Sequence, residues 1–206
     1  MIDFVPFAKI ARFSRDIIVT EKIDGTNAQI YVSEDGTVTA GSRTRWITPE
    51  DDNFGFAAWV RDHVKELRGL GPGSHFGEWW GAGIQRRYGL TEKRFSLFNV
   101  SRWGDEPQIC PRCNKTAEAP RCAHCTMEIA QKPMRPACCS VVPVLWRGNF
   151  DDLHPRELLE KLRIEGSAAA PGFMKPEGIV IFHHASGQLF KKTLEKDEEP
   201  KTRNGK

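Results

Sequence analysis

Residues 17–32 read Ile-Ile-Val-Thr-Glu-Lys-Ile-Asp-Gly-Thr-Asn-Ala-Gln-Ile-Tyr-Val, which is two β-rich runs around a polar stretch. The first run covers residues 17–20. The second covers residues 28–32, where apolar and polar side chains alternate as on a half-buried strand. The polar stretch between the runs contains a lysine and a glycine. This layout predicts two strands in sequence, joined by a short segment that carries Lys22.

Further strand and helix signals follow along the chain. Glu34-Asp35-Gly36 predicts a hairpin turn. Apolar residues at helical spacing predict a helix that ends before the Gly/Pro cluster at residues 69–73. The expected helices cover residues 54–68 and 155–163, and further strands cover residues 37–40, 76–80, 95–100, 140–145, 178–182 and 188–193. Short strands with few helices favour an α+β domain built on antiparallel sheets.

The composition fits a globular domain. The 206 residues are 39% hydrophobic and 28% charged, which suits one domain or one domain with a small insert. A net charge of +3 excludes a uniformly basic coat but leaves room for a local basic face. No apolar run approaches the roughly 20 residues of a membrane helix. With no signal-peptide pattern at the N-terminus, we expect a cytoplasmic protein without a membrane partner.

Two basic segments suggest phosphate chemistry. Lys22-Ile23-Asp24-Gly25 could be a plain surface turn, but a lysine becomes a nucleophile when burial or cations depress its pKa. Gly25 would let the backbone approach a ligand closely. Arg43 and Arg45 follow a strand and suit phosphate contact, with a solvated strand edge as the alternative.

Two carboxylates and a lysine pair complete the set. Glu78 lies beside two tryptophans, of which at least one is expected in the core, and could accept a ribose hydroxyl. Glu177 opens a strong buried-strand run, where a divalent cation could bind near phosphates. Lys191 and Lys192 alternate along the next strand, so one of them is expected to point into a site.

Read in order, these segments resemble six motifs of the covalent nucleotidyltransferase superfamily of ligases and capping enzymes. The matches to motifs I, Ia, III, IIIa, IV and V are, in that order, Lys22-Ile23-Asp24-Gly25, Ser42-Arg43, Phe76-Gly77-Glu78, residues 95–100, residues 177–181 and Lys191-Lys192. They span nearly the whole chain. Within the superfamily, Thr20–Asn27 and Glu78-Trp79-Trp80-Gly81 are similar to the ATP-dependent RNA ligase family, including small bacteriophage members.

This resemblance implies an α+β fold with an adenylyltransferase (ATP-grasp-like ligase) domain of antiparallel sheets with flanking helices. We expect that nucleotidyltransferase domain over residues 1–194, a small zinc-knuckle insert over 108–132 and a mobile charged tail over 195–206. Since DNA ligases and capping enzymes of the superfamily usually append an OB-fold after motif V, and this chain stops soon after it, no OB-fold domain is expected.

The resemblance also implies roles for individual residues. Lys22 would attack the α-phosphate of ATP and carry AMP. The AMP would pass to an RNA 5′-phosphate, and a 3′-hydroxyl would then close the break. Arg43, Lys191 and Mg²⁺ or Mn²⁺ would offset phosphate charge, with the metal on Glu177 directly or through water.

Other residues would bind the nucleotide. Glu78 would hold the ribose and Phe98 would stack on the adenine, while Asp24 would orient the surroundings of Lys22. The remaining expected nucleotide contacts are Glu21 and Lys192. Two departures from the family pattern are Thr193, where a second motif V lysine is common, and Asn99, where motif IIIa is often acidic.

Residues 101–137 are rich in Pro, Cys, Arg and Lys and show no apolar period. Two C-x₂-C pairs, Cys110/Cys113 and Cys122/Cys125, have the spacing of a tetrahedral zinc site. In one interpretation, zinc only stabilises an insert that is too small to form a hydrophobic core. In the other, the zinc-bound insert also contacts RNA through Arg112, Lys115 and Arg121. His124 is a weaker alternative ligand, and Cys138 and Cys139 are expected to be ordinary thiols.

The main hypothesis is an ATP-dependent RNA ligase that joins 3′-OH and 5′-phosphate ends. One alternative is a minimal ATP-dependent DNA ligase that seals nicks. Another is a non-catalytic, zinc-bearing nucleic-acid-binding protein with a decayed ligase fold. The resemblance further suggests a monomer in RNA repair, working with an end-healing kinase-phosphatase, in the host cytoplasm if the chain is of phage origin.

Overall fold

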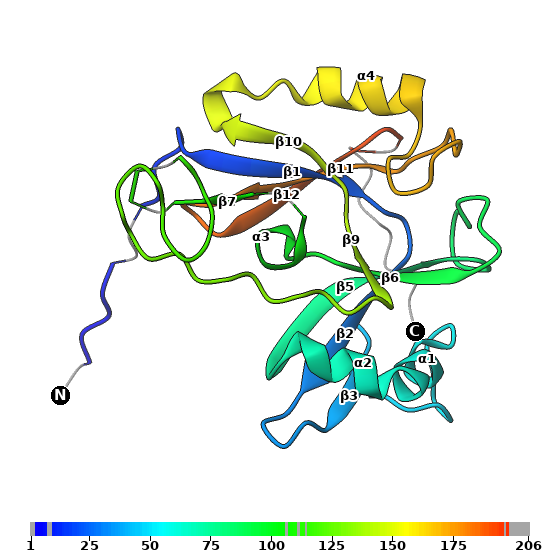
Figure 1. Cartoon of the computed structure of the whole chain (residues 1–206). Coiled ribbons are helices and arrows are strands. Elements are labelled where there is room, and N and C mark those ends of the chain that lie inside the picture. Colours follow the sequence, from blue (N-terminus) through cyan, green and yellow to red (C-terminus); the bar gives the residue numbers. More distant parts are fainter. Residues whose placement is uncertain are drawn as a thin grey trace. The chain divides into compact units, whose positions relative to one another are not determined.

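The computed structural model describes residues 3–7, 10–105, 107–110, 112–113, 115–195 and 197. Chain contacts divide into two compact units. Unit 1 contains residues 1–22 and 143–206, and unit 2 contains residues 23–142. Antiparallel strand pairs dominate the sheets and helices are few (Figure 1), so the expected α+β class is confirmed. The prediction of one domain over residues 1–194 stays a prediction, and most of the predicted tail lies outside the described residues.

Unit 1 is a four-stranded antiparallel sheet in the order β10-β1-β11-β12. Its strands are β1 (Asp16–Lys22), β10 (Val144–Asn149), β11 (Gly178–His183) and β12 (Gln188–Thr193), joined by the 3₁₀ turn η2 (Phe150–Asp152) and helix α4 (Pro155–Glu165). Figure 1 shows α4 lying along the sheet beside β10. Leu159 and Leu162 of α4 pack on Ile17, Ile179 and Ile181, so one face of the sheet is the core of this unit.

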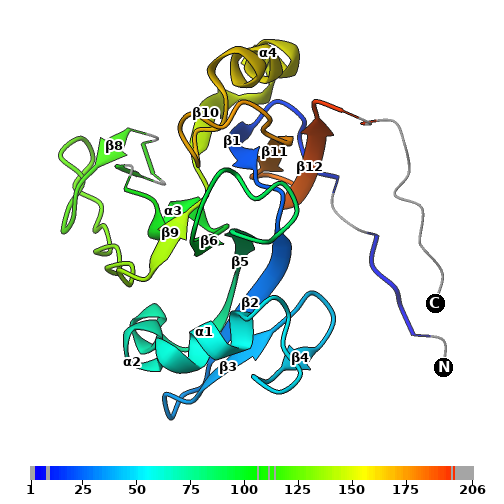
Figure 2. The ribbon, with the colours of Figure 1, turned by 90° about the vertical axis from the view of Figure 1, so that its right-hand side faces the viewer.

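Unit 2 is built on a six-stranded sheet in the order β4-β3-β2-β5-β6-β9. Its strands are β2 (Thr26–Val32), β3 (Val38–Gly41), β4 (Trp46–Ile47), β5 (Gly73–Gly81), β6 (Lys93–Leu97) and β9 (Cys139–Val141). Figure 2 shows α1 (Phe56–Asp62) and α2 (Val64–Leu67) next to β2 and β3. Phe56 and Val60 pack with Ile30, Trp79 and Phe95, which buries this face of the sheet.

Three predicted elements are interrupted or shortened in the structure. The helix expected over residues 54–68 is interrupted at His63, whose N–H is shared between the carbonyls of Trp59 and Val60. The chain then forms α2 and the 3₁₀ turn η1 (Arg68–Leu70). The strand expected over 95–100 ends at Leu97, because Asn99 caps the short helix α3 (Val100–Trp103).

The strand expected over 140–145 divides at Pro143. Proline has no N–H to continue a ladder. Val142 donates to Leu97 in unit 2, whereas the carbonyl of Pro143 accepts from Glu21 in unit 1. The boundary between the units along the chain therefore coincides with this proline.

The expected insert contains one two-stranded sheet, β7 (Gln108–Ile109) paired with β8 (Thr116–Ala117). A separate small core forms here from Ala117, Ile129 and the buried thiols of Cys110 and Cys122. So small a core supplies little burial free energy, which fits a segment that needs a further cross-link.

Candidate functional site

Lys22 is the last residue of β1, and its ammonium contacts the carboxylate of Glu177. The Nζ–Oε2 distance is 2.5 Å. Glu177 directly precedes β11, whose first residue, Gly178, pairs with Lys22 in the sheet. The sheet register therefore joins two residues that are far apart in sequence. The side chains are 19% and 8% exposed, so water screens this ion pair only in part.

The two lysines of β12 lie on opposite faces of the unit 1 sheet. Lys191 is paired with Val180, and Val180 with Thr20, two residues before Lys22 on β1. Directly paired residues share a face, and so do residues two apart in a strand. Lys191 is therefore on the same face as Lys22.

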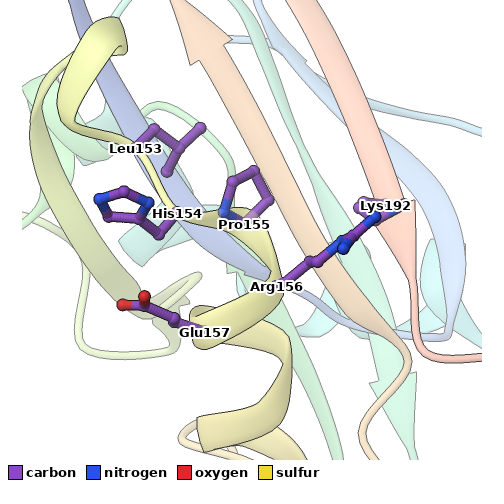
Figure 3. A pocket seen from close by; sticks show the side chains of 6 residues that line it. All are labelled: Leu153, His154, Pro155, Arg156, Glu157 and Lys192. Atoms are coloured by element: carbon purple, nitrogen blue, oxygen red, sulfur yellow. The ribbon is translucent and has the colours of Figure 1, made fainter.

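Lys192 is on the face that α4 covers, in register with buried Ile179. Its ammonium lies 2.9 Å from a carboxylate oxygen of Asp197. Lys192 lines a pocket together with His154 and Arg156 near the start of α4, and Figure 3 shows the Arg156 side chain extending toward Lys192. A direct nucleotide contact by Lys192 beside Lys22 is thus disfavoured by the register.

Glu21 also faces α4. Its side chain is 1% exposed and accepts hydrogen bonds from the Ser167 hydroxyl (2.6 Å) and the Ala169 N–H (2.9 Å). Burial raises the pKa of Glu21, while these donors oppose the shift. The carboxylate fixes the loop after α4, and a nucleotide contact by Glu21 stays a prediction.

In unit 2, Glu78 lies in the middle of β5 and is largely buried. Its two carboxylate oxygens accept from the Gly25 N–H (3.0 Å) and the Asn27 side-chain amide (3.2 Å). Asn27 is its register partner on β2. This holds the carboxylate in a fixed orientation against the end of the Lys22–Gly25 motif.

Gly25 is required for packing against β5 in the structure. A Cβ there would lie 2.4 Å from the Trp79 carbonyl oxygen and 2.8 Å from Trp80 Cβ. The close approach expected for a ligand is thus made by the protein's own strand. Both tryptophans are buried: Trp79 lies in the main core, and Trp80 donates to the Ser96 hydroxyl on the other face.

Asp24 has two partners from the loop after β5. Its carboxylate lies 3.0 Å from Arg86 Nε, and its backbone N–H donates to the Tyr88 hydroxyl at 2.8 Å. Tyr88 in turn packs edge-on against Trp80. The sequence alone gives no signal for Arg86 and Tyr88 as partners of Asp24, because a local pattern does not reveal contacts with residues more than 60 positions away.

Comparison with known proteins decides the family. Residues 15–193 match the family model described as RNA ligase, which is most of the chain. The chain belongs to the RNA ligase family. Its predicted membership is confirmed.

Solved structures with a similar fold are variants of an RNA ligase from Naegleria gruberi. One was solved with AMP and Mn (TM-score 0.54, 17% identity, 88% of this chain and 50% of that one). Another was solved with ATP and Mn (TM-score 0.53, 16% identity, 87% and 49%). At such identity the likeness concerns the fold alone. This RNA ligase family member spans about half the length of the Naegleria ligases it matches.

The remaining motif residues of this RNA ligase family member lie on exposed parts of unit 2. Phe98 directly follows β6 and is 40% exposed. Asn99, the departure in motif IIIa, accepts the N–H of Arg102 as a helix cap. Arg43 lies in the turn between β3 and β4 and is exposed.

Four cysteines converge in the insert. The sulfurs of Cys110, Cys113, Cys122 and Cys125 all lie within 4.8 Å of one another. Four sulfurs about 2.3 Å from a tetrahedral zinc ion would be about 3.8 Å apart. The observed pairs at 3.4 Å and 3.6 Å are close to that spacing, so the donor set fits Zn²⁺.

Cys138 and Cys139 lie outside this cluster, and burial raises the pKa of both thiols. They are not part of the candidate metal centre. Within the part of the chain that the structure describes, no helix is long and apolar enough to cross a membrane.

Proposed function

We propose that this member of the RNA ligase family is an ATP-dependent RNA ligase that carries AMP on Lys22. The observation that supports this most directly is the ion pair between Lys22 and Glu177 at the end of β1. It places a lysine beside a carboxylate that could hold a divalent cation. The Naegleria structures, which hold ATP or AMP with Mn, are in line with this chemistry for a protein of similar fold.

In the first step, the uncharged amine of Lys22 attacks the α-phosphorus of ATP. A P–N bond forms, the bond to pyrophosphate breaks, pyrophosphate leaves, and the amine nitrogen gives up one proton to water. Mg²⁺ or Mn²⁺ bound by Glu177, directly or through water, would draw the carboxylate away from the amine and offset phosphate charge.

Two further steps transfer AMP to RNA and release it. An oxygen of the RNA 5′-phosphate attacks the α-phosphorus and the P–N bond to Lys22 breaks. The RNA 3′-hydroxyl then attacks the activated 5′-phosphate, and AMP leaves. Lys191, on the Lys22 face of the unit 1 sheet, and Arg43 are proposed to offset the charge that builds on phosphate.

Nucleotide binding is proposed for residues of unit 2. Glu78 accepts a ribose hydroxyl from the orientation that Gly25 and Asn27 fix. Phe98 stacks on the adenine, and Asp24 orients the segment after Lys22 through Arg86. Glu21 and Lys192 lie on the face of the unit 1 sheet opposite to Lys22, which favours structural roles for them rather than direct nucleotide contacts.

We also propose a structural Zn²⁺ on Cys110, Cys113, Cys122 and Cys125. Four thiolates leave no open position on the metal, so zinc would not take part in adenylyl transfer. The role that the cluster supports is a cross-link for the insert, whose own core is small.

The deciding experiment is incubation with α-labelled ATP and Mg²⁺, followed by denaturing electrophoresis. Wild type should retain label and Lys22→Ala should not. Lys22→Arg is the matched control, because it keeps the positive charge beside Glu177 but supplies no nucleophile at neutral pH. Label retained by Lys22→Ala contradicts the assignment of the nucleophile, and a wild type that takes no label overturns the proposed function.

A second assay separates the RNA ligase from its alternatives. Nicked duplexes with either RNA or DNA on the 3′-hydroxyl side should be sealed faster with RNA. Preference for the all-DNA nick supports the minimal DNA ligase instead. Nucleic-acid binding without label or sealing supports the non-catalytic alternative.

A further inference from the structure

One register row of the unit 2 sheet carries exposed aromatic side chains. Trp46 on β4 is paired with Gly41, Gly41 with Gln29, and Gln29 with Phe76. The Phe98 N–H donates to the Phe76 carbonyl and continues the row across β5 and β6. Trp46, Phe76 and Phe98 are 53%, 55% and 40% exposed. We name these three residues the aromatic row.

The row lies on the face opposite the core of unit 2. Ile30 and Trp79, which alternate with the row residues on β2 and β5, are buried under α1. Next to the row on the outer face, two residues along each strand, are Asn27 and Glu78. Rows on one face are about 7 Å apart, since a strand rises about 3.3–3.4 Å per residue.

The Trp46 ring is held in place by the sheet. Two of its ring carbons occupy the space above Gly41, where a Cβ would meet both at 3.1 Å. Tyr31, which is itself 39% exposed, lies beside Trp46, with ring centroids 6.0 Å apart and the ring planes tilted. The sheet thus presents a fixed aromatic surface, so little conformational entropy is lost when a flat ligand binds it.

Polar groups are interleaved with these rings. Gln29 lies in the same register row, between Gly41 and Phe76, and its side-chain amide donates to the Ser74 hydroxyl at 2.9 Å. The turn directly before Trp46 carries Arg43 and Arg45, the latter paired with Asp51. A contiguous exposed apolar patch would instead mark a site for a protein partner. Aromatic faces with polar edges and nearby guanidinium groups suit nucleobases and phosphates.

We propose that the aromatic row binds unpaired bases of the RNA strand next to the end being joined. Base faces are accessible only where the strand is unpaired, so the row selects single strands over duplex. Trp46 and Phe76 each stack on a base, and Arg43 contacts the backbone. This inference rests on the proposed RNA ligase function, in which Phe98, at the end of the row, stacks on the adenine and Glu78, next to the row, holds the ribose.

The test is fluorescence anisotropy with labelled 5′-phosphorylated oligouridylate, free or annealed to oligoadenylate, in EDTA and without ATP. Stacking contributes about 1–3 kcal/mol per base. Trp46→Ala and Phe76→Ala should therefore weaken single-strand binding about fivefold or more, and leave duplex binding within about twofold. Trp46→Leu, which keeps an apolar side chain but no π face, should behave like Trp46→Ala, and Trp46→Phe should recover most of the affinity.

Ile164→Ala, which removes an exposed apolar side chain of α4, is the control and should bind like wild type. Covalent labelling by ATP should be unchanged in Trp46→Ala. Single-strand binding by both alanine variants within twofold of wild type, or equal losses for single strand and duplex, overturns the proposal. Because binding is measured without ATP, a wild type that takes no label would overturn only the proposed function.

Discussion

Lys191 lies on the same face of the unit 1 sheet as Lys22. Lys191 is exposed to solvent, whereas Lys192 on the opposite face is half-buried. A substitution of either lysine removes one positive charge from the same strand. Lys191→Ala should lower the rate of lysyl-AMP formation about 100-fold, the usual cost of losing one group that stabilises transition-state charge. Lys192→Ala should change it by no more than a few-fold. The measurement is single-turnover labelling at saturating ATP.

The contrast between the two variants tests the register itself. Equal losses in Lys191→Ala and Lys192→Ala would mean that net charge, not the face, determines the rate. A larger loss in Lys192→Ala would show that the assignment of Lys191 is wrong.

Gly25→Ala should lower the free energy of unfolding of unit 2. The new Cβ would meet the Trp79 carbonyl and Trp80 Cβ at less than 3 Å, and neither atom belongs to the flexible end of a side chain. Overpacking of this kind costs about 1–3 kcal/mol of the free energy of unfolding. Because the same clash would displace the Gly25 N–H that donates to Glu78, covalent labelling should fall as well.

The matched control for Gly25 is Gly69→Ala. A Cβ at Gly69 would make only an ordinary contact with Pro136 at 3.7 Å. Urea unfolding should separate the two variants, with Gly69→Ala close to wild type. Equal stability of both variants would contradict the packing role of Gly25.

These contacts show what could and could not be predicted from the sequence. Alternation over residues 28–32 and the apolar run at 178–182 predicted β2 and β11, because local burial determines such patterns. Motif order and the C-x₂-C spacing led to the family and to the cysteine cluster. The pairing of Asp24 with Arg86 could not be predicted, since it depends on a loop that returns across the sheet.

The same limit applies to Glu21. The family resemblance implies that Glu21 contacts the nucleotide, and this stays a prediction. In the structure, alternation along β1 turns the Glu21 side chain to the α4 face. Glu21 is next to Lys22 in the sequence, but neighbouring residues of a strand point to opposite faces of the sheet. The role of Ser167 as its partner has no signal in the sequence.

Glu21 should make stability depend on pH. Burial raises its pKa in the folded state above the ordinary value of 4.5. Between these two values the folded protein holds the proton that the unfolded chain has lost, so the free energy of unfolding falls as pH rises. The stabilising contribution is complete below about pH 4.5 and is lost as pH passes the raised value.

Glu21→Gln removes this ionisation and is expected to remove the corresponding pH dependence. Urea unfolding of wild type and Glu21→Gln from pH 4.5 upward should show wild type losing stability relative to the variant. Parallel pH profiles for the two proteins would show that Glu21 ionises in the folded state as it does in the unfolded chain.

Zinc removal should destabilise the insert and spare adenylyl transfer. The four clustered thiols have zinc-like spacing, and Cys138 supplies a control from outside the cluster. Metal analysis should find about one zinc per chain in wild type and in Cys138→Ser, and much less in Cys110→Ser, since a structural site needs all four ligands. Protease cleavage within residues 108–132 should become faster in Cys110→Ser, because an insert with so small a core depends on the metal for its fold. Labelling by ATP should stay within a few-fold of wild type, since four thiolates leave the metal no position for substrate.

Full zinc occupancy in Cys110→Ser, or zinc loss in Cys138→Ser, would contradict this ligand set. Loss of labelling together with zinc would instead show that the insert supports the catalytic residues.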